Sequence, residues 1–126
     1  NQLQLNHDST FGAEAMIAGY RHGALWLDDV VTYIAGNHAF AADYIENNSP
    51  GVRKVKAEAT YLGWLDFRGT GLGQDEIMER LVNKGCVGLY SGTDFGEEGV
   101  GFFRMNLACP RAVLERGLDG IRKALS

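Results

Sequence analysis

The stretch VGFFRMNLA, residues 100–108, decides the fold of this chain. From position 102 onward it alternates as a β-strand does, and its apolar face carries Phe103, Met105 and Leu107. Arg104 lies on the opposite face, between Phe102 and Asn106. A guanidinium in that place suits a carboxylate, because its planar fork can donate two parallel hydrogen bonds. The alternatives are an arginine on an edge strand, or one paired with an internal Asp or Glu.

The segment before this strand, residues 91–101, is rich in glycine and in polar side chains. Loops of this composition often surround a ligand, but a long hairpin connection has the same composition. Both interpretations are open from the residues alone.

Further strands and helices are predicted around this segment. Residues 59–67 are almost entirely apolar, which favours a strand covered on both faces. Residues 86–90 predict another strand, residues 74–84 a short amphipathic helix, and the residues after Pro110 a last helix with one apolar stripe. Together these elements predict an α+β domain in which helices pack on a small, mostly antiparallel sheet.

The N-terminal third of the chain has helical periodicity. Ser9 and Thr10 are candidate N-cap residues, and Gly23 interrupts the helix that follows them. A longer helix is predicted over residues 25–47, before a Ser-Pro-Gly turn that ends at Gly51. Its apolar face carries Leu27, Val30, Val31, Ile34, His38, Ala41 and Ile45. Such a helix is long for a small domain and suits a connection between two domains.

Charge and hydropathy exclude several kinds of partner. The formal net charge is −4, and no run of Lys and Arg is long enough to neutralise a nucleic-acid backbone. The short basic cluster at residues 53–56 is expected on an exposed edge. No stretch approaches the roughly 20 apolar residues that span a bilayer. We therefore expect neither a nucleic-acid partner nor a membrane partner.

Motifs for metal and phosphate binding are incomplete. The three histidines lie far apart, with no carboxylate at metal-ligand spacing: they are His7, His22 and His38. The glycines at 69, 71 and 73 match neither the dinucleotide-binding motif nor the Walker motif, which favours a flexible turn. We expect no metal site and no phosphate loop in this chain.

The two cysteines, Cys86 and Cys109, stand far apart among apolar neighbours. This context predicts buried free thiols rather than a disulfide or a catalytic nucleophile. Free thiols indicate a reducing compartment, and hence a cytoplasmic location.

Two blocks of the sequence resemble the C-terminal part of fold-type I, pyridoxal-phosphate (PLP)-dependent class I/II aminotransferases. The first block is EATYLGWLDF, residues 58–67. The second begins at Gly85 and ends with RMNLACPR, residues 104–111. Within this family the chain is most similar to the cystathionine β-lyase-like C–S lyases of the PatB and MalY type. The resemblance covers nearly the whole chain, and the two blocks are specific in combination.

The resemblance implies roles for particular residues. Arg104 matches the strand arginine that binds the α-carboxylate of the amino-acid substrate. The loop before it would approach that substrate from the small domain, through Ser91, Gly92 and Phe95. Pro110 and Arg111 match the motif that begins the last helix.

The resemblance also implies a division into domains. Residues 1–24 would be a leading helix or the tail end of a large domain that lies outside this chain. Residues 25–126 would be the C-terminal small domain, with residues 25–47 as its connector helix.

The cofactor of this family is bound through a lysine of the large domain, in a Ser/Thr-x-x-Lys context. The lysines of this chain stand in other contexts: they are Lys54, Lys56, Lys84 and Lys123. We therefore expect no catalytic and no cofactor-binding residue here, and no activity from the chain alone. PLP and a homodimeric assembly are expected of the full-length enzyme.

The implied function is that of a PLP-dependent enzyme acting on amino acids. It would be either a C–S lyase, releasing a thiol, pyruvate and ammonia, or an aminotransferase, and the sequence leaves both open. The alternative is a stand-alone, non-enzymatic α+β module that binds a small molecule or a protein. The first hypothesis predicts an exposed apolar surface, including part of the stripe between Leu27 and Ile45, whereas the alternative predicts a sealed surface.

Overall fold

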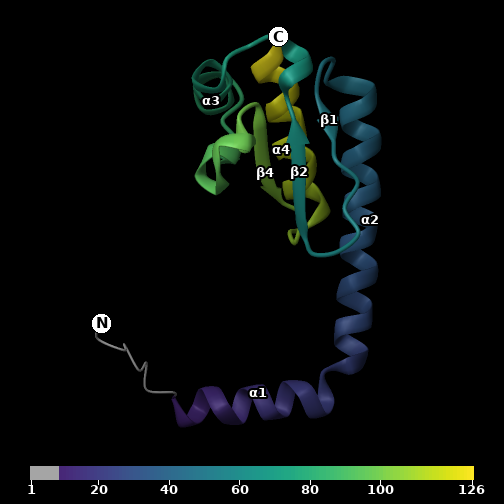
Figure 1. Ribbon diagram of the computed structural model, residues 1–126. Coiled ribbons are helices and arrows are strands. Elements are labelled where there is room, and N and C mark those ends of the chain that lie inside the picture. Colours follow the sequence, from purple (N-terminus) through teal and green to yellow (C-terminus); the bar gives the residue numbers. More distant parts are fainter. Residues whose placement is uncertain (1–8) are drawn as a thin grey trace, which may run out of the picture. The chain divides into compact units, whose positions relative to one another are not determined.

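A computed structural model describes residues 9–126 of the chain (Figure 1). The chain divides into two compact units, Asn1–Tyr33 and Ile34–Ser126. Helix α1 spans Thr10–His22. Helix α2 spans Ala24–Asn48 and passes from the first unit into the second. Both helices agree closely with the predicted ones.

The first unit contains α1 and the first turns of α2. Helix α1 begins after Ser9 and ends at Gly23, whose amide donates to the Gly19 carbonyl oxygen at 2.8 Å. None of the α1 residues is buried. Large apolar side chains are exposed on both helical segments: Phe11, Met16, Tyr20, Leu25, Trp26 and Leu27. The described part of the chain thus leaves a substantial apolar surface open to solvent.

The second unit is built on a four-stranded antiparallel sheet, which confirms the predicted small antiparallel sheet and adds a short strand at residues 53–54 that was not predicted. Its strands are β1 (Arg53–Lys54), β2 (Leu62–Asp66), β3 (Tyr90–Ser91) and β4 (Phe102–Asn106), in the order β1-β2-β4-β3. Strand β4 is therefore an internal strand, paired with β2 and β3. The register places Arg104 opposite both Trp64 and Tyr90, and Phe102 opposite Asp66.

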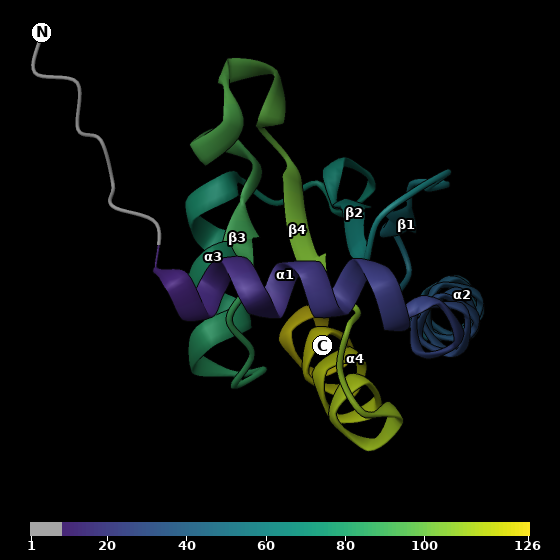
Figure 2. The ribbon, with the colours of Figure 1, turned by 90° about the horizontal axis from the view of Figure 1, so that it is seen from below.

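One face of this sheet shares a core with α2, α3 (Gln74–Asn83) and α4 (Arg111–Leu125). The core residues of the sheet include Leu65, Phe103 and Met105. The helices contribute Ala41, Ile45, Ile77, Leu81, Leu114, Leu118, Ile121 and Ala124. Figure 2 shows α4 on one side of β2 and β4, and the segment that joins β3 to β4 on the other side. We call the helix-covered side the inner face and the opposite side the outer face.

The strand predicted at residues 86–90 is largely wrong. Only Tyr90 lies in a strand, and β3 continues to Ser91. The reason is that residues 84–87 complete the C-terminal end of α3: the amides of Lys84 and Val87 donate to the carbonyl oxygens of Arg80 and Leu81. Cys86 has a φ of 51°, which is incompatible with a strand.

Two predictions of burial are also wrong. Cys86 is exposed, because it lies in this turn rather than in a strand, and Cys109 is half-buried. On α2, the predicted stripe includes His38, but Asn37 is the fully buried residue at that level of the helix. The stripe is covered only in its second half, where Ala41 and Ile45 are buried, whereas Leu27 is exposed.

Candidate functional site

Arg104 lies in the middle of the outer face. The predicted alternation along β4 is confirmed, because Phe103 and Met105 are buried in the core while Phe102 and Arg104 are half-buried on the other side. Trp64 and Tyr90 lie directly opposite Arg104 on the two neighbouring strands. The Arg104 side chain therefore projects from an internal strand, with an aromatic residue opposite it on each neighbouring strand.

Aromatic rings fix the orientation of this guanidinium. Arg104 Cζ lies 4.3 Å from the ring centroid of Phe95 and 4.9 Å from that of Tyr90. The ring of Phe95 contacts Trp64 edge to face, with centroids 5.8 Å apart. A cation over an aromatic face is attracted by the ring electrons, and the attraction constrains the cation without neutralising it. Arg104 is thus oriented while keeping its full charge.

The guanidinium of Arg104 lacks a polar partner in the described part of the chain. Its Nε atom is buried and makes no hydrogen bond there. The ion pairs between residues 9 and 126 involve other arginines and Lys123, so Arg104 is not paired with an internal carboxylate. A buried donor without an acceptor costs about 1–3 kcal/mol. The arrangement therefore favours an acceptor from outside the chain, and a carboxylate has the matching planar shape.

The loop that carries Phe95 is anchored by Gln74, the first residue of α3. The Gln74 side chain donates from Nε2 to Ser91 Oγ at 2.7 Å and accepts at Oε1 from the Gly101 amide at 2.6 Å. Ser91 Oγ also lies 2.7 Å from Thr93 Oγ1. One amide side chain thus ties together the two ends of the loop, so the position of Phe95 depends on α3.

Two glycines, Gly92 and Gly99, allow the first and second halves of this loop to come into contact. The loop consists of two 3-10 turns, η2 (Gly92–Phe95) and η3 (Glu97–Gly99). Gly92 and Gly99 are both buried and face each other so closely that a Cβ on either would overlap the carbonyl of the other. Side chains are therefore excluded at both positions, and the loop folds back over the outer face.

The aromatic surface continues from Trp64 to a second arginine. Trp64 stacks on Phe102 with centroids 5.8 Å apart, and Arg68 Cζ lies 4.5 Å above the Phe102 ring. Arg68 also binds the buried Asp66 carboxylate through Nε and Nη2, each at 2.9 Å. These hydrogen bonds, with a further one from Arg53, hold the pKa of the Asp66 carboxyl well below its usual range, against the opposing effect of burial. We call Arg68, Phe102, Trp64, Phe95, Arg104 and Tyr90 the aromatic row.

The end of β4 is fixed by Asn37. Its buried side chain donates from Nδ2 to the carbonyl oxygens of Leu107 at 2.8 Å and Cys109 at 3.0 Å. Its Oδ1 accepts from Arg111 Nε at 3.0 Å, and the Arg111 guanidinium lies 4.3 Å above the Phe40 ring. Arg111 is the first residue of α4, as the sequence predicted. Asn37 therefore joins α2, the segment after the arginine strand and the start of α4.

In the described part of the chain, the potential metal ligands and the four lysines are placed as follows. Residues 9–126 contain no group of three His, Cys, Asp or Glu side chains arranged to hold a metal. Lys54 lies toward the inner face, where its Cε would be 3.7 Å from a Cβ on Gly63, and burial lowers the pKa of its amine. Lys123 pairs with Asp119 on α4 at 2.8 Å, and Lys56 and Lys84 are exposed. These positions do not suit a Schiff base beside Arg104.

His38 is an inner-side residue rather than part of the aromatic row. Its Nε2 lies 3.1 Å from the Thr60 carbonyl oxygen, and burial together with the charge of Lys54 lowers its pKa. His7 lies outside the described residues. No helix between residues 9 and 126 combines the length and apolar character that crossing a membrane requires.

The structure brings only part of the predicted loop into contact with Arg104. Phe95 stacks on the guanidinium, whereas Ser91 is bound to Gln74 and Gly92 packs against Gly99. Sequence reasoning missed Tyr90, Trp64 and Gln74 as parts of this site. An aromatic residue at an outer-face position of each flanking strand was a usable signal for the first two. The contact of Gln74 with Gly101 has no local signal in the sequence.

Sequence comparison places this chain among PLP-enzyme relatives. It is 41% identical over 118 residues to cystathionine β-lyase PatB of Bacillus subtilis, covering 94% of this chain and 30% of PatB. It is 35% identical over 121 residues to protein MalY of Escherichia coli, covering 96% of this chain and 31% of MalY. No protein-family model matches the chain.

Structural comparison gives the same result. The chain superposes with a TM-score of 0.91 and 42% identity on a PLP-bound protein of Clostridium difficile described as an aminotransferase. That match covers 94% of this chain and 30% of the other. The chain spans about 30% of the length of the proteins it matches. The resemblance drawn from the sequence is thereby confirmed: over nearly its whole length, the chain is homologous to a C-terminal portion of the PatB and MalY-type enzymes and shares the small-domain fold of fold-type I PLP enzymes.

Proposed function

We propose that this chain is the substrate-orienting C-terminal portion of a PLP-dependent enzyme that acts on amino acids, and that Arg104 binds the α-carboxylate of the substrate. The observation that carries the proposal is the guanidinium of Arg104, which is oriented by Phe95 and Tyr90 and has a buried, unpaired Nε. A charged donor held in one orientation loses little entropy when it binds a carboxylate. The surrounding rings lower the local polarity, which strengthens the ion pair that forms.

The reaction is either β-elimination at a C–S bond or transfer of the amino group. We favour the C–S lyase, because PatB of Bacillus subtilis is a cystathionine β-lyase by name and is 41% identical to this chain. In either reaction PLP would supply the electron sink. The part of Arg104 is to bind and orient the carboxylate, while the aromatic row excludes water from that end of the substrate.

The groups that hold the cofactor are assigned to a large domain outside this chain. The positions of the four lysines support this assignment, since Lys54 faces the inner side and Lys123 is paired on α4. In this proposal residues 1–24 belong to the leading or large-domain part, and residues 25–126 form the small domain. The isolated chain would then bind no cofactor and have no activity.

The exposed apolar surface of the first unit supports a missing domain. Phe11 and Tyr20 are 87% and 88% exposed, and Met16, Tyr20 and Trp26 line a shallow apolar hollow within this unit. Contiguous apolar surface of this kind is typical of a face that another protein part covers. A stand-alone module predicts a sealed surface, so this observation favours the enzyme hypothesis. We further propose a homodimeric enzyme in the cytoplasm, where free thiols such as Cys86 and Cys109 are common.

The decisive test replaces Arg104 by Ala in the full-length protein. Loss of two charge-assisted hydrogen bonds should lower kcat/KM for the amino-acid substrate by at least about 100-fold. The absorbance of the bound cofactor should not change, because Arg104 does not hold the cofactor in this proposal. Arg104→Lys should recover only part of the loss, since an ammonium lacks the planar fork.

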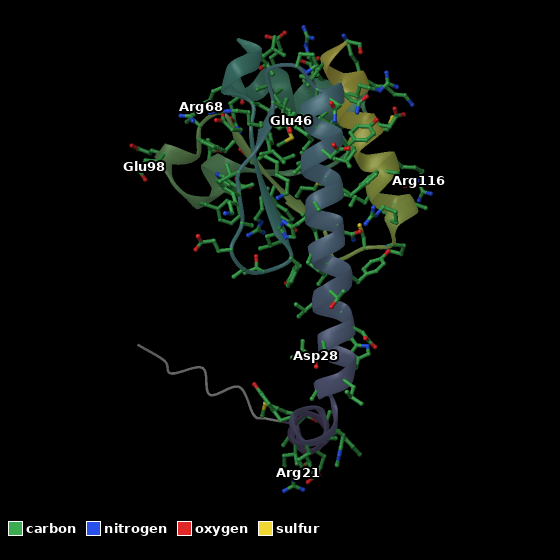
Figure 3. The ribbon with its side chains drawn as sticks, turned by 90° about the vertical axis from the view of Figure 1, so that its right-hand side faces the viewer. Arg21, Asp28, Glu46, Arg68, Glu98 and Arg116 are labelled. Carbon is green, nitrogen blue, oxygen red and sulfur yellow. The ribbon has the colours of Figure 1, made fainter. Side chains whose placement is uncertain are left out.

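Arg116 provides the matched control. It is an exposed arginine on α4, on the opposite side of the sheet from Arg68 and Glu98 (Figure 3). Arg116→Ala removes the same charge from the domain and should leave kcat/KM within about twofold. An Arg104→Ala enzyme with unchanged kcat/KM would refute the assignment of Arg104.

A further inference from the structure

Arg68 is a second arginine on the outer face, and its side chain is also held in place by several contacts. Its Nε and Nη2 bind Asp66, and its guanidinium lies over the Phe102 ring. Its aliphatic part packs on Gly101, where a Cβ would overlap Arg68 Cγ. Three contacts therefore fix a side chain that is still 59% exposed to solvent.

The positive charge around Arg68 is only partly neutralised. The single carboxylate of Asp66 binds both Arg53 and Arg68, which leaves one of the two positive charges without a counterion. Arg68 Nη1 makes no hydrogen bond to any residue from 9 to 126. The acidic residues of the neighbouring loop, Asp94, Glu97 and Glu98, form no ion pair with either arginine of the aromatic row. An anion at Nη1 would complete the charge balance.

The two arginines lie at opposite ends of an apolar floor. The Trp64–Arg104 pair and the Asp66–Phe102 pair are two residues apart along the strands, or about 7 Å. Between the guanidiniums the rings of Phe95, Trp64 and Phe102 are in continuous contact. A molecule lying on this face would meet a cation, then an apolar stretch, then a second cation.

We infer that Arg68 binds a second carboxylate, at the far end of the substrate side chain. The inference rests on the proposed function, in which Arg104 binds the α-carboxylate. It makes Arg68 a specificity-determining residue: the enzyme prefers an amino acid whose apolar or thioether side chain ends in a carboxylate over one that lacks this group. Phe102 and Trp64 then contact the middle of that side chain.

The test compares two thioether substrates with and without the distal carboxylate. Steady-state kcat/KM is measured with the full-length, PLP-loaded enzyme for L-cystathionine and for S-ethyl-L-cysteine. Arg68→Gln should lower kcat/KM about tenfold for cystathionine, because one charge-assisted contact is lost, and less than twofold for S-ethylcysteine. Glutamine retains a hydrogen-bonding side chain but removes the charge.

Arg53 is the matched control for this variant. It binds the same Asp66 carboxylate but has no aromatic contact with Phe102 and is not part of the aromatic row. Arg53→Gln therefore perturbs Asp66 without touching the proposed subsite. It should change kcat/KM for the two substrates by equal, small factors. The inference would be overturned if Arg68→Gln lowered kcat/KM by the same factor for both substrates, or left it unchanged for both.

Inhibition gives a readout that does not depend on whether the enzyme is a lyase or an aminotransferase. Suberate has two carboxylates and octanoate has one, on carbon chains of equal length. Arg68→Gln should raise the Ki of suberate about tenfold and leave that of octanoate unchanged. If Arg68→Gln leaves the ratio of the two Ki values unchanged, the role inferred for Arg68 is wrong, but the proposed function is not affected. If neither acid competes with substrate and Arg104→Ala has no effect, it is the proposed function that fails.

Discussion

The two faces of one small sheet have opposite properties although they are built from the same ten residues of β2 and β4. On the inner face, Leu65 and Phe103 are at most 1% exposed and pack in the helix-covered core. On the outer face, Trp64, Phe102 and Arg104 are half-buried. Trp64 stacks on Phe102, and both Trp64 and Arg104 contact Phe95 of the loop. A shift of one residue along a strand thus separates the packed core from the half-buried aromatic row, because side chains alternate between the faces.

Substitutions on the inner face should act mainly on the free energy of unfolding. Those on the outer face should act, under the proposed function, mainly on substrate binding. Three sets of variants test this contrast.

The largest expected effect comes from a pair of neighbouring phenylalanines. Phe103→Ala removes a fully buried ring that packs against Phe67, and should lower the free energy of unfolding by about 3–5 kcal/mol. Phe102→Ala removes the same ring from the half-buried outer face and should cost about 1 kcal/mol. Urea denaturation of both variants measures the difference. Equal losses would show that the outer face is as much a part of the core as the inner one.

A smaller effect is expected from the buried amide side chain of Asn37 on α2. Asn37→Leu leaves the carbonyls of Leu107 and Cys109 without their donor and should cost about 2–3 kcal/mol. Asn47→Leu is the matched control, because the exposed Asn47 donates to Asp43 within its own helix. Its unfolding free energy should stay within about 0.5 kcal/mol of the parent value. If Asn37→Leu leaves the free energy of unfolding unchanged, apolar packing alone holds α2 against the end of β4 and the start of α4.

The smallest effect concerns Asp66, an outer-face residue that is nevertheless buried. Its pKa in the folded chain is well below the unfolded value of about 3.9, so its stabilising contribution is complete above that value and is lost as the pH falls through the folded pKa. Because its partners Arg53 and Arg68 are largely exposed, solvent weakens this contribution. Unfolding free energies measured from pH 7 to pH 2 should differ most between the parent and Asp66→Asn at neutral pH and converge in acid. If the unfolding free energies of the parent and of Asp66→Asn differ by the same amount at every pH, the ion pairs of Asp66 do not stabilise the fold.

The sequence predicted those parts of the fold that depend on local periodicity. Alternation along β4 placed Arg104 on the correct face, and the helix stops at Gly23 and after Asn48 follow from local glycine and proline chemistry. The spacing of Asn37 four residues before Ala41, and of Ala41 four residues before Ile45, also marked the buried face of α2. The apolar stripe instead predicts His38 on that face, where Asn37 is buried.

The remaining features depend on contacts between distant residues. Apolar residues predict a strand at residues 86–90, but the Val87 amide instead donates to the Leu81 carbonyl oxygen at the end of α3. Gln74 reaches Gly101 across 27 positions, and Asn37 reaches Cys109 across 72. No local pattern encodes such pairings, because each partner alone is an ordinary polar residue or glycine.

The junction at Asn37 also has a mechanical consequence. One side chain links the second half of α2 to the segment after β4 and to the first residue of α4. These hydrogen bonds fix the three elements to one another. If Arg104 binds substrate as proposed, a shift of this half of α2 should be transmitted through Asn37 to the end of β4, the strand that carries Arg104.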